Sequence, residues 1–393
     1  MIEADMMRED HWPTLISSAL AAVVVGFAST ILVVMQAAEA VGASEAQKIS
    51  WAAMLCFAMG GLTLWLSWRH KMPMIIAWST PGSALLATSA HGVAYTAALG
   101  AFAVAGLLAA LTGLIAPLAR AVERIPTTIA SAMLAGVLLT YVLQVPAAAI
   151  AMPWQVLPLV IAFFVLRLWK PMWTVPIVVV LGLALAALTG IINFNAEDVA
   201  LARLKFDWPQ FSLAAIISLG LPLYLVTMAS QNLPGFAVLR ASGYQPPVAS
   251  ALITTGLASA LLSPFMGPQV NMAAITASLT TGPDTHPDAS KRWKVAIPYM
   301  VLYVIVGLGA GLFVKVLGAL PTDLVHAIAG LALFSPLMGA VQAMMKEPNE
   351  IEAALVTFLI TASGIVIVGI GAPFWGLVIG LVIWGLKRQM VKA

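Results

Sequence analysis

Long runs of apolar residues, separated by short polar stretches, occupy almost the whole chain. A run of about 20 apolar residues is long enough to cross a bilayer as a helix, and the pattern predicts fourteen such segments. In the first half they are residues 15–43, 49–67, 72–90, 94–118, 127–145, 154–168 and 172–192. In the second half they are residues 211–239, 246–263, 264–281, 295–314, 322–344, 351–371 and 373–386. The predicted fold class is therefore an all-α polytopic membrane protein.

A polar stretch, "NFNAEDVALARLKFDWPQ" (193–210), divides the segments into seven on each side. An odd number of spans in each half places the two halves in opposite orientations, as in the inverted repeats of many secondary transporters. The expected organisation is a first repeat (1–192), a periplasmic connector (193–210) and a second repeat (211–393). "VMQAAEAVG" (34–42) and "TMASQNLPG" (227–235) align without gaps at an offset of 193 residues, which supports the repeat.

The third segment of each half differs from an ordinary span. "IIAWSTPGSALL" (75–86) and "LLSPFMGPQVNMAAITAS" (261–278) each contain an extended-looking piece followed by a proline. Proline is tolerated at a first helical turn, and the residue before it favours extended geometry. We expect a short strand ("IIAWST" or "LLSPFM") and a half-helix that begins at Pro81 or Pro268. Two helix N-termini meeting near the midplane would form an anion site.

The composition places most of the chain in lipid. It is 61% hydrophobic and 9% charged, whereas soluble domains carry about 25% charged residues. The single cysteine, Cys56, excludes an intramolecular disulfide and a cysteine-rich metal site. The motifs GxxxxGK[ST], HExxH and GxSxG do not occur. We therefore expect neither an enzyme nor a bound metal or cofactor. The net charge of +3 is small and gives no sign of a nucleic-acid partner, and none is expected.

The basic residues predict the orientation. With the N-terminus inside, fifteen Lys and Arg residues fall in inner loops, and four fall on the outer side. This bias predicts that both termini are cytoplasmic and that residues 193–210 lie outside. The N-terminal "MIEADMMREDHWP" is acidic and mixed, so the first apolar segment is expected to be a membrane helix rather than a signal peptide.

Polar side chains around the third, eighth and tenth segments are the candidate substrate site. The amides of Gln231 and Asn232 would either bind an anion or tie helices together by hydrogen bonds, and the sequence alone does not decide between these two roles. Pro234 and Gly235 are expected to loosen the helix that these amides end. The candidate substrate-binding set is Ser79, Thr80, Gly82, Ser83, Gln231, Asn232, Gln269 and Asn271, flanked by the aromatic residues Trp78, Phe236 and Phe265.

Glu39 is the candidate for proton coupling, with Gln36 one turn earlier on the same face. An ionisable residue inside a bilayer is usually functional, and a low-dielectric position near the midplane would let Glu39 take up a proton. The alternative is a span that ends earlier, with Glu39 facing outer water. His91 and His326 could titrate near neutral pH, but both are expected at an interface.

Three stretches resemble a known family. "ASQNLPGFAVLRASGY", "IAWSTPGSALL" and "GPQVNMAAITASL" are similar to those of the benzoate/proton symporters, the BenE-like transporters of the bacterial inner membrane. The resemblance implies import of benzoate with protons. It also implies an architecture similar to that of the uracil-type nucleobase transporters, with a core domain (15–118 and 211–314) and a gate domain (127–192 and 322–386). A homodimer is compatible with this architecture.

One departure from the nucleobase transporters bears on the substrate. Where they carry acidic residues in the eighth and tenth segments, this chain has Gln231 and Gln269. A carboxylate at these positions would repel benzoate, so the amides fit an anionic substrate. Two alternatives stay open on the same scaffold: a passive anion channel or uniporter, and a transporter of another small anion or a nucleobase. No nucleophile–base pair supports an intramembrane enzyme.

Overall fold

Helices form most of the fold in a computed structural model of the chain. The structure describes residues 11–90, 92–115, 117, 126–171, 173–191, 202–265, 267–367 and 370–390. The first half contains α2 (Trp12–Ala40), α3 (Glu45–His70), β1 (Ile76–Trp78), α4 (Thr80–Ser89), α5 (Tyr95–Leu114), α7 (Thr127–Val142), α8 (Gln144–Ala151), α9 (Pro153–Trp169) and α10 (Thr174–Leu188).

The second half begins with one long helix assembled from α11 (Leu213–Ala215), η2 (Ile216–Gly220), α12 (Leu221–Thr227), η3 (Met228–Asn232) and α13 (Leu233–Ala241). It continues with α14 (Val248–Leu262), β2 (Val270–Met272), α15 (Ile275–Ser278), η4 (Ala289–Val295), α16 (Ala296–Leu308), α17 (Ala310–Gly318), α18 (Thr322–Met344), η5 (Pro348–Glu350), α19 (Ile351–Ala362), β3 (Val366–Ile367), β4 (Ile370–Gly371) and α20 (Ala372–Met390). Each of the fourteen predicted segments overlaps at least one of these elements.

Six helices in the described ranges are long and apolar enough to cross a membrane. They are α2, α3, α5, the helix from α7 through α8, the helix from α11 through α13, and α18. The helix of η4 and α16, together with α17, would make a seventh if this pair, bent by 55°, counts as one span. The other predicted segments contain shorter helices or strands, so the figure of fourteen spans stays a prediction.

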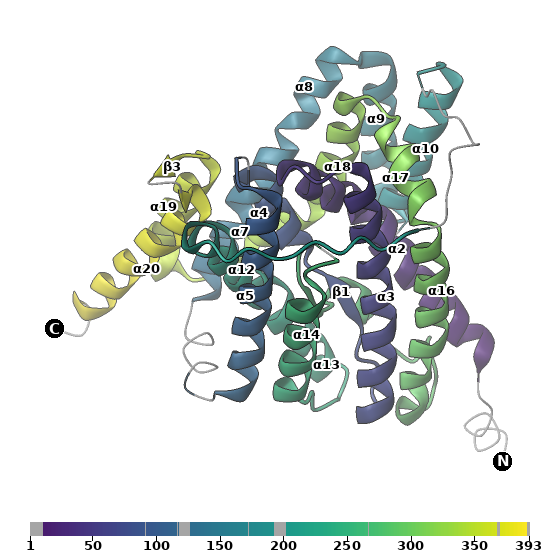
Figure 1. Cartoon of the computed structure of the whole chain (residues 1–393), viewed down its shortest axis with the longest axis horizontal. Helices are drawn as coiled ribbons and strands as arrows, with labels where there is room; N and C mark the ends of the chain where they lie inside the picture. The colour runs from purple at the N-terminus through teal and green to yellow at the C-terminus, as the bar shows by residue number, and fades with distance from the viewer. Residues whose placement is uncertain are drawn as a thin grey trace.

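The helices pack into two groups (Figure 1). The helices α3, α5, α14 and α16 lie roughly parallel, with α5 on α14 and α3 on α16. The helices α7, α18, α19 and α20 pack on one another, with α19 and α20 at one flank in yellow. Contact between α5 and α14 depends on glycine, because a Cβ on Gly256 would come within 2.4 Å of the backbone nitrogen of Ala110.

Two short strands cross in the interior of the bundle. β1 and β2 are antiparallel, and Ala77 pairs with Asn271 at their centre. The pairing extends beyond the strands, since the Ser79 N–H donates to the Gln269 carbonyl (2.9 Å) and the Ala273 N–H donates to the Ile75 carbonyl (2.9 Å). Each strand thus satisfies the backbone of the other, which is the condition for non-helical backbone inside a membrane protein.

The first of the two predicted strand and half-helix segments is confirmed, and the details of the second are wrong. α4 follows β1 and has Pro81 in its first turn, as predicted. In the second half, however, α14 continues through Leu262, and Pro268 precedes β2 instead of starting a helix. The helix after β2 begins at Ile275 and has four residues. Proline is compatible with a strand start and a helix start, so it could not distinguish them.

The amides Gln231 and Asn232 do not end their helix, which is a second correction. They belong to η3, a five-residue π-helical segment, and the helix continues through α13 to Ala241. Pro234 follows η3 by two residues, and Pro222 follows η2 in the same way. A proline ring clashes with the helix turn before it, and a π turn provides a wider one. Such π segments occur frequently at functional sites.

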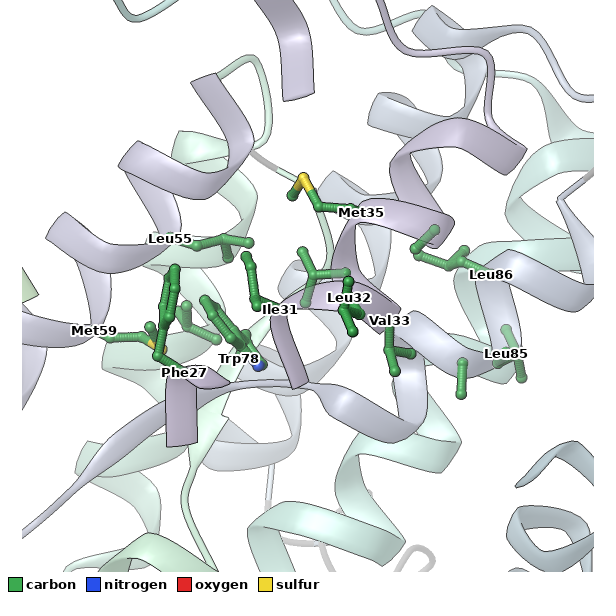
Figure 2. Packing of buried hydrophobic residues seen from close by; sticks show 14 of the residues in the cluster. Phe27, Ile31, Leu32, Val33, Met35, Leu55, Met59, Trp78, Leu85 and Leu86 are labelled. Carbon is green, nitrogen blue, oxygen red and sulfur yellow. The ribbon is translucent and has the colours of Figure 1, made fainter. Parts of the chain in front are cut away.

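The hydrophobic core is centred on α2 (Figure 2). Phe27 and Ile31 lie beside Leu55 and Met59 of α3 and beside Trp78 of β1. Further along α2, Val33 lies near Leu85 and Leu86 of α4. One apolar helix therefore packs between α3 on one side and the β1–α4 segment on the other.

The predicted connector is described from Ala202 onward; residues 193–201 lie outside the described residues. Its described part is extended and crosses several helix ends. The N–H groups of Ala202, Asp207 and Gln210 donate to the carbonyls of Leu308, Pro264 and Thr96, at 3.2, 3.0 and 2.9 Å. The end of α16, the turn after α14 and the start of α5 therefore lie along this one extended segment.

Candidate substrate site

The candidate site begins with the strand crossing and the capped start of α4. The Ser79 hydroxyl accepts the Gly82 N–H (3.1 Å) and bonds the Thr227 hydroxyl (2.7 Å). The Ser83 hydroxyl donates to the Ser79 carbonyl (2.9 Å). All four residues are buried. The polar groups predicted to hold an anion at Gly82 and Ser83 are thus bonded within the protein in this conformation.

A small cavity, which we call the strand cavity, lies beside the crossing. Its volume is about 70 Å³, which is room for a few water molecules, each of which occupies about 30 Å³ of liquid. The residues that line it are Val25, Gly26, Thr30, Met59, Ala77, Trp78, Thr80, Gln231, Ala273, Ala274, Ile275, Thr276 and Tyr303. Three predicted site residues, Trp78, Thr80 and Gln231, therefore line one cavity.

Trp78 is held rigidly in the wall of the strand cavity. Its indole N–H donates to the Thr30 hydroxyl (2.7 Å), and its ring centroid lies 5.7 Å from that of Phe27. Tyr303 contributes a second aromatic wall and lies against Tyr299, whose hydroxyl donates to the Ile76 carbonyl (2.9 Å). The cavity thus combines fixed aromatic faces with hydroxyl and amide groups.

The four predicted amides have different surroundings. The side-chain Oδ1 of Asn232 accepts the Met272 N–H (3.0 Å), so this residue ties η3 to β2, one of the two roles expected for it. Gln269 and Asn271 are buried, and neither amide atom of Gln269 nor the Asn271 Oδ1 has a hydrogen-bond partner. The hydroxyl of Thr276, which lines the strand cavity, is also buried without a partner.

Two aromatic residues of the predicted set lie away from this cavity. Phe265 contacts Phe206 of the extended connector, at a centroid distance of 5.2 Å, and its carbonyl accepts the Ser50 hydroxyl (2.8 Å). Phe236 on α13 is 1% exposed and does not line the strand cavity. The sequence pattern did not single out four other residues that line this cavity. Thr30, Met59 and Tyr303 lie in otherwise ordinary apolar segments, and Thr276 lies in the discontinuous segment 261–278, after the predicted amides.

A second cavity of about 510 Å³, which we call the large cavity, lies between α2, α4, α7, α8, α17 and α18. Its lining residues are Leu32, Met35, Gln36, Glu39, Ala40, Lys48, Ala87, Thr88, Tyr141, Gln144, Val314, Leu317, Gly318, Leu320, Thr322, Val325 and His326. The proton-coupling candidates Gln36 and Glu39 are here, together with His326; His91 lies outside the described residues. Gln144 was missed, although an amide in the apolar run "LLTYVLQVP" resembles the signal that singled out Gln231.

The prediction that Glu39 occupies a low-dielectric position near the midplane is wrong in this conformation. Its side chain is 76% exposed at the penultimate residue of α2, and it pairs with Lys48 at 3.5 Å. The apolar run continues through the end of the helix, so the pattern could not show that Glu39 had reached the surface. Gln36, one turn earlier, has both amide atoms buried without a partner.

The described residues contain no group of three or more His, Cys, Asp or Glu residues that could hold a metal ion. Helices long enough to cross a membrane, two discontinuous segments that meet inside the bundle, and two cavities between the helices define a membrane transport protein. A family profile described as benzoate membrane transport protein (BenE) matches residues 9–386. The chain belongs to this family, and it is a transporter, not an enzyme.

Two relatives cover nearly the whole chain. Inner membrane protein YdcO of Escherichia coli (strain K12) is 38% identical over 370 residues, which is 94% of each chain. The benzoate membrane transport protein of Acinetobacter baylyi (strain ATCC 33305 / BD413 / ADP1) is 32% identical over 360 residues, which is 92% of this chain and 91% of the relative.

Two solved structures are similar in fold. The transmembrane domain of the cyanobacterial bicarbonate transporter BicA has a TM-score of 0.59 at 14% identity, with 94% of this chain and 96% of that chain covered. SLC26A9 has a TM-score of 0.58 at 13% identity, with 95% of this chain but 65% of that chain covered. At these identities the likeness concerns the fold alone.

Proposed function

We propose that this protein is a secondary active transporter that imports benzoate, or a similar aromatic carboxylate, together with protons. Membership of the benzoate membrane transport family supports the substrate class. The observation that carries the proposal is the strand cavity, where two discontinuous segments meet beside a fixed indole and an amide. The ring would lie against Trp78 and Tyr303, and the carboxylate would accept hydrogen bonds from Thr80, Gln231 and Thr276.

The other predicted substrate-binding residues would act around the strand cavity. Gln269 and Asn271 carry buried amide atoms without partners, and such groups cost free energy unless a ligand or water satisfies them. Ser79, Gly82, Ser83 and Asn232 would hold α4 and β2 in place. At about 70 Å³ the cavity is below the usual range for ligand sites, about 300–1,000 Å³. We therefore infer that loading the substrate widens it.

The widening would come from movement of a gate domain (127–192 and 322–386) against a core domain (15–118 and 211–314). The packing supports this division, because α5 with α14 and α3 with α16 fall within the core, whereas α7 with α18 and α19 falls within the gate. Strands β1 and β2 join the two halves of the core.

The strand crossing also supports inverted repeats. The two strands pair in antiparallel register, and the partners at the centre, Ala77 and Asn271, are 194 residues apart in the sequence. That offset is close to the 193 residues of the sequence alignment. Seven spans in each half, in opposite orientations, would place equivalent strands of the two halves in such an antiparallel pair.

Coupling to protons would depend on Glu39, the acidic residue among those that line the large cavity, with Gln36 beside it. For this role Glu39 must leave the exposed position that it has here, when the gate closes over it. Glu39→Gln is expected to bind benzoate but to lose proton-driven accumulation, whereas benzoate exchange across the membrane continues. Normal accumulation by this variant would assign coupling to another group.

The protein would be a multi-pass component of the bacterial inner membrane, as the name of the E. coli relative says of that protein. We propose cytoplasmic termini, membrane lipid around the apolar helix faces, and assembly as a homodimer. No nucleic-acid partner is expected.

Uptake of labelled benzoate into proteoliposomes, with and without an inward proton gradient, tests the proposal. Accumulation above the external concentration only with the gradient is expected. Uptake that stops at equal concentrations in both conditions would favour a passive channel or uniporter. Uracil and acetate as competitors test the remaining alternatives, a nucleobase or another small anion, because neither should reduce benzoate uptake if an aromatic acid is the substrate.

A further inference from the structure

We propose that the large cavity is a second binding site for the aromatic carboxylate, occupied before the substrate reaches the strand cavity. This inference rests on the proposed function, because it assumes that such an acid is carried. It concerns a separate position, since Thr88 near the end of α4 lines the large cavity and Thr80 at its start lines the strand cavity. Eight residues of helix separate them by about 12 Å.

The size and walls of the large cavity suit an aromatic acid. Its volume of about 510 Å³ falls in the range of small-molecule sites, about 300–1,000 Å³. Most of the wall is apolar and would cover a ring; it is formed by Leu32, Met35, Val314, Leu317, Leu320 and Val325. Glu39, Gly318 and Thr322 are exposed, so the cavity opens to the surface at their side of the bundle.

Two amides, one on α2 and one on α8, supply the polar part of the site. Gln36 lies on α2, and both atoms of its amide are buried without a hydrogen-bond partner. Gln144 begins α8, and its amide oxygen is also buried without one. Buried polar groups are nearly always satisfied. A carboxylate between these helices would accept an Nε2–H from Gln36 and an Nε2–H from Gln144, whereas the amide oxygens, which can only accept, would be met by water.

Lys48 supplies the charge. In its ion pair with Glu39, the lysine side chain is 23% exposed and the glutamate side chain is 76% exposed. The ammonium is therefore the inner member of the pair, and the carboxylate is turned towards solvent. A substrate carboxylate could replace Glu39 on Lys48 without leaving a buried charge unpaired, because Glu39 would remain hydrated.

Tyr141 bonds to α4 midway between Thr80 and Thr88, the residues of this helix that line the two cavities. It is buried on α7, lines the large cavity, and its hydroxyl donates to the Ala84 carbonyl of α4 (3.3 Å). This bond joins the proposed gate to the proposed core between the two ends of α4. A substrate in the large cavity would therefore wait until α7 moves away from α4.

Uptake kinetics test the site. Lys48→Met and Gln144→Leu are expected to raise the KM for external benzoate about tenfold, since one charge-assisted hydrogen bond is lost, and to leave the uptake rate at saturation within twofold. The matched controls Lys315→Met and Gln155→Leu remove the same groups outside the cavity and should leave KM unchanged. If wild-type protein transports benzoate and KM is unchanged in both cavity variants, the inference is overturned.

A binding measurement is independent of transport. In a Cys56→Ala background, the thiol of Val325→Cys should react with an impermeant maleimide, and benzoate, but not uncharged benzamide, should slow the reaction. Protection should persist when Gln231→Leu impairs the strand cavity and should disappear with Lys48→Met. If protection is lost with Gln231→Leu but persists with Lys48→Met, it comes indirectly from the strand cavity, and the inference is overturned. Absence of benzoate uptake by wild-type protein would instead refute the proposed function.

Discussion

Replacing Gln269 by methionine should stabilise the protein and weaken its binding of benzoate. Gln269 is 2% exposed, and both atoms of its amide are buried without a partner. Each such group costs about 1–3 kcal/mol, so Gln269→Met, which keeps the side-chain length, should gain about 2–6 kcal/mol at most. The backbone bond from the Ser79 N–H to the Gln269 carbonyl does not involve the side chain and should survive.

The effect of Gln269→Met on the affinity for benzoate is separate from its effect on stability. If the amide donates to a substrate carboxylate, its removal costs about 1.5–3 kcal/mol, which is about a ten- to hundredfold weaker affinity. An enzyme or transporter commonly retains a destabilising group because the group serves its function. Stability and affinity should therefore change in opposite directions.

The assay combines thermal unfolding of the purified protein in detergent, followed by tryptophan fluorescence, with benzoate binding to the same sample. Gln155→Met on the half-buried side of α9 is the control, and it should change neither quantity. A variant that is less stable than wild type would mean that a bound water satisfies the amide. A variant that is more stable but binds benzoate normally would remove Gln269 from the substrate site.

Three further predictions follow from the packing and the topology. Ser79→Ala should lower the free energy of unfolding by about 1–2 kcal/mol, because it removes the cap of α4 and the hydrogen bond to Thr227. A double-mutant cycle with Thr227→Val, measured by SDS titration, should give a coupling energy of about 1 kcal/mol. Strict additivity of the two substitutions would contradict the hydrogen bond. Gly256→Val should separate α5 from α14 and abolish expression of folded protein, measured by monodisperse elution; a folded variant would show that these helices are not in close contact. Lys205→Cys, in a Cys56-free chain, should react with an impermeant thiol reagent in intact spheroplasts, and labelling only after permeabilisation would reverse the orientation.

Some features of the fold and site were predictable because they depend on local sequence. Apolar runs mark helices regardless of their partners, so the bounds of α2, α3, α5 and α18 agree with the pattern to within a few residues. Pro81 predicted a helix start after a short strand, and Ser79, two residues earlier, is the N-cap of that helix. Trp78, Thr80 and Gln231 were singled out because each lies beside a helix break in an apolar segment, and all three line the strand cavity. Their part in binding substrate stays a prediction.

Other features depended on contacts between distant residues. Pro268 fits a strand start as well as a helix start, and the pairing of β2 with β1 decided which one forms. Glu39 belongs to the same apolar run as Gln36, but the end of α2 and the nearby Lys48 placed its carboxylate in solvent. The large cavity joins α2 to α8 and α18, more than a hundred residues away. A sequence pattern records the preference of each residue for helix, strand or lipid, whereas a cavity is the space left between elements after they have packed.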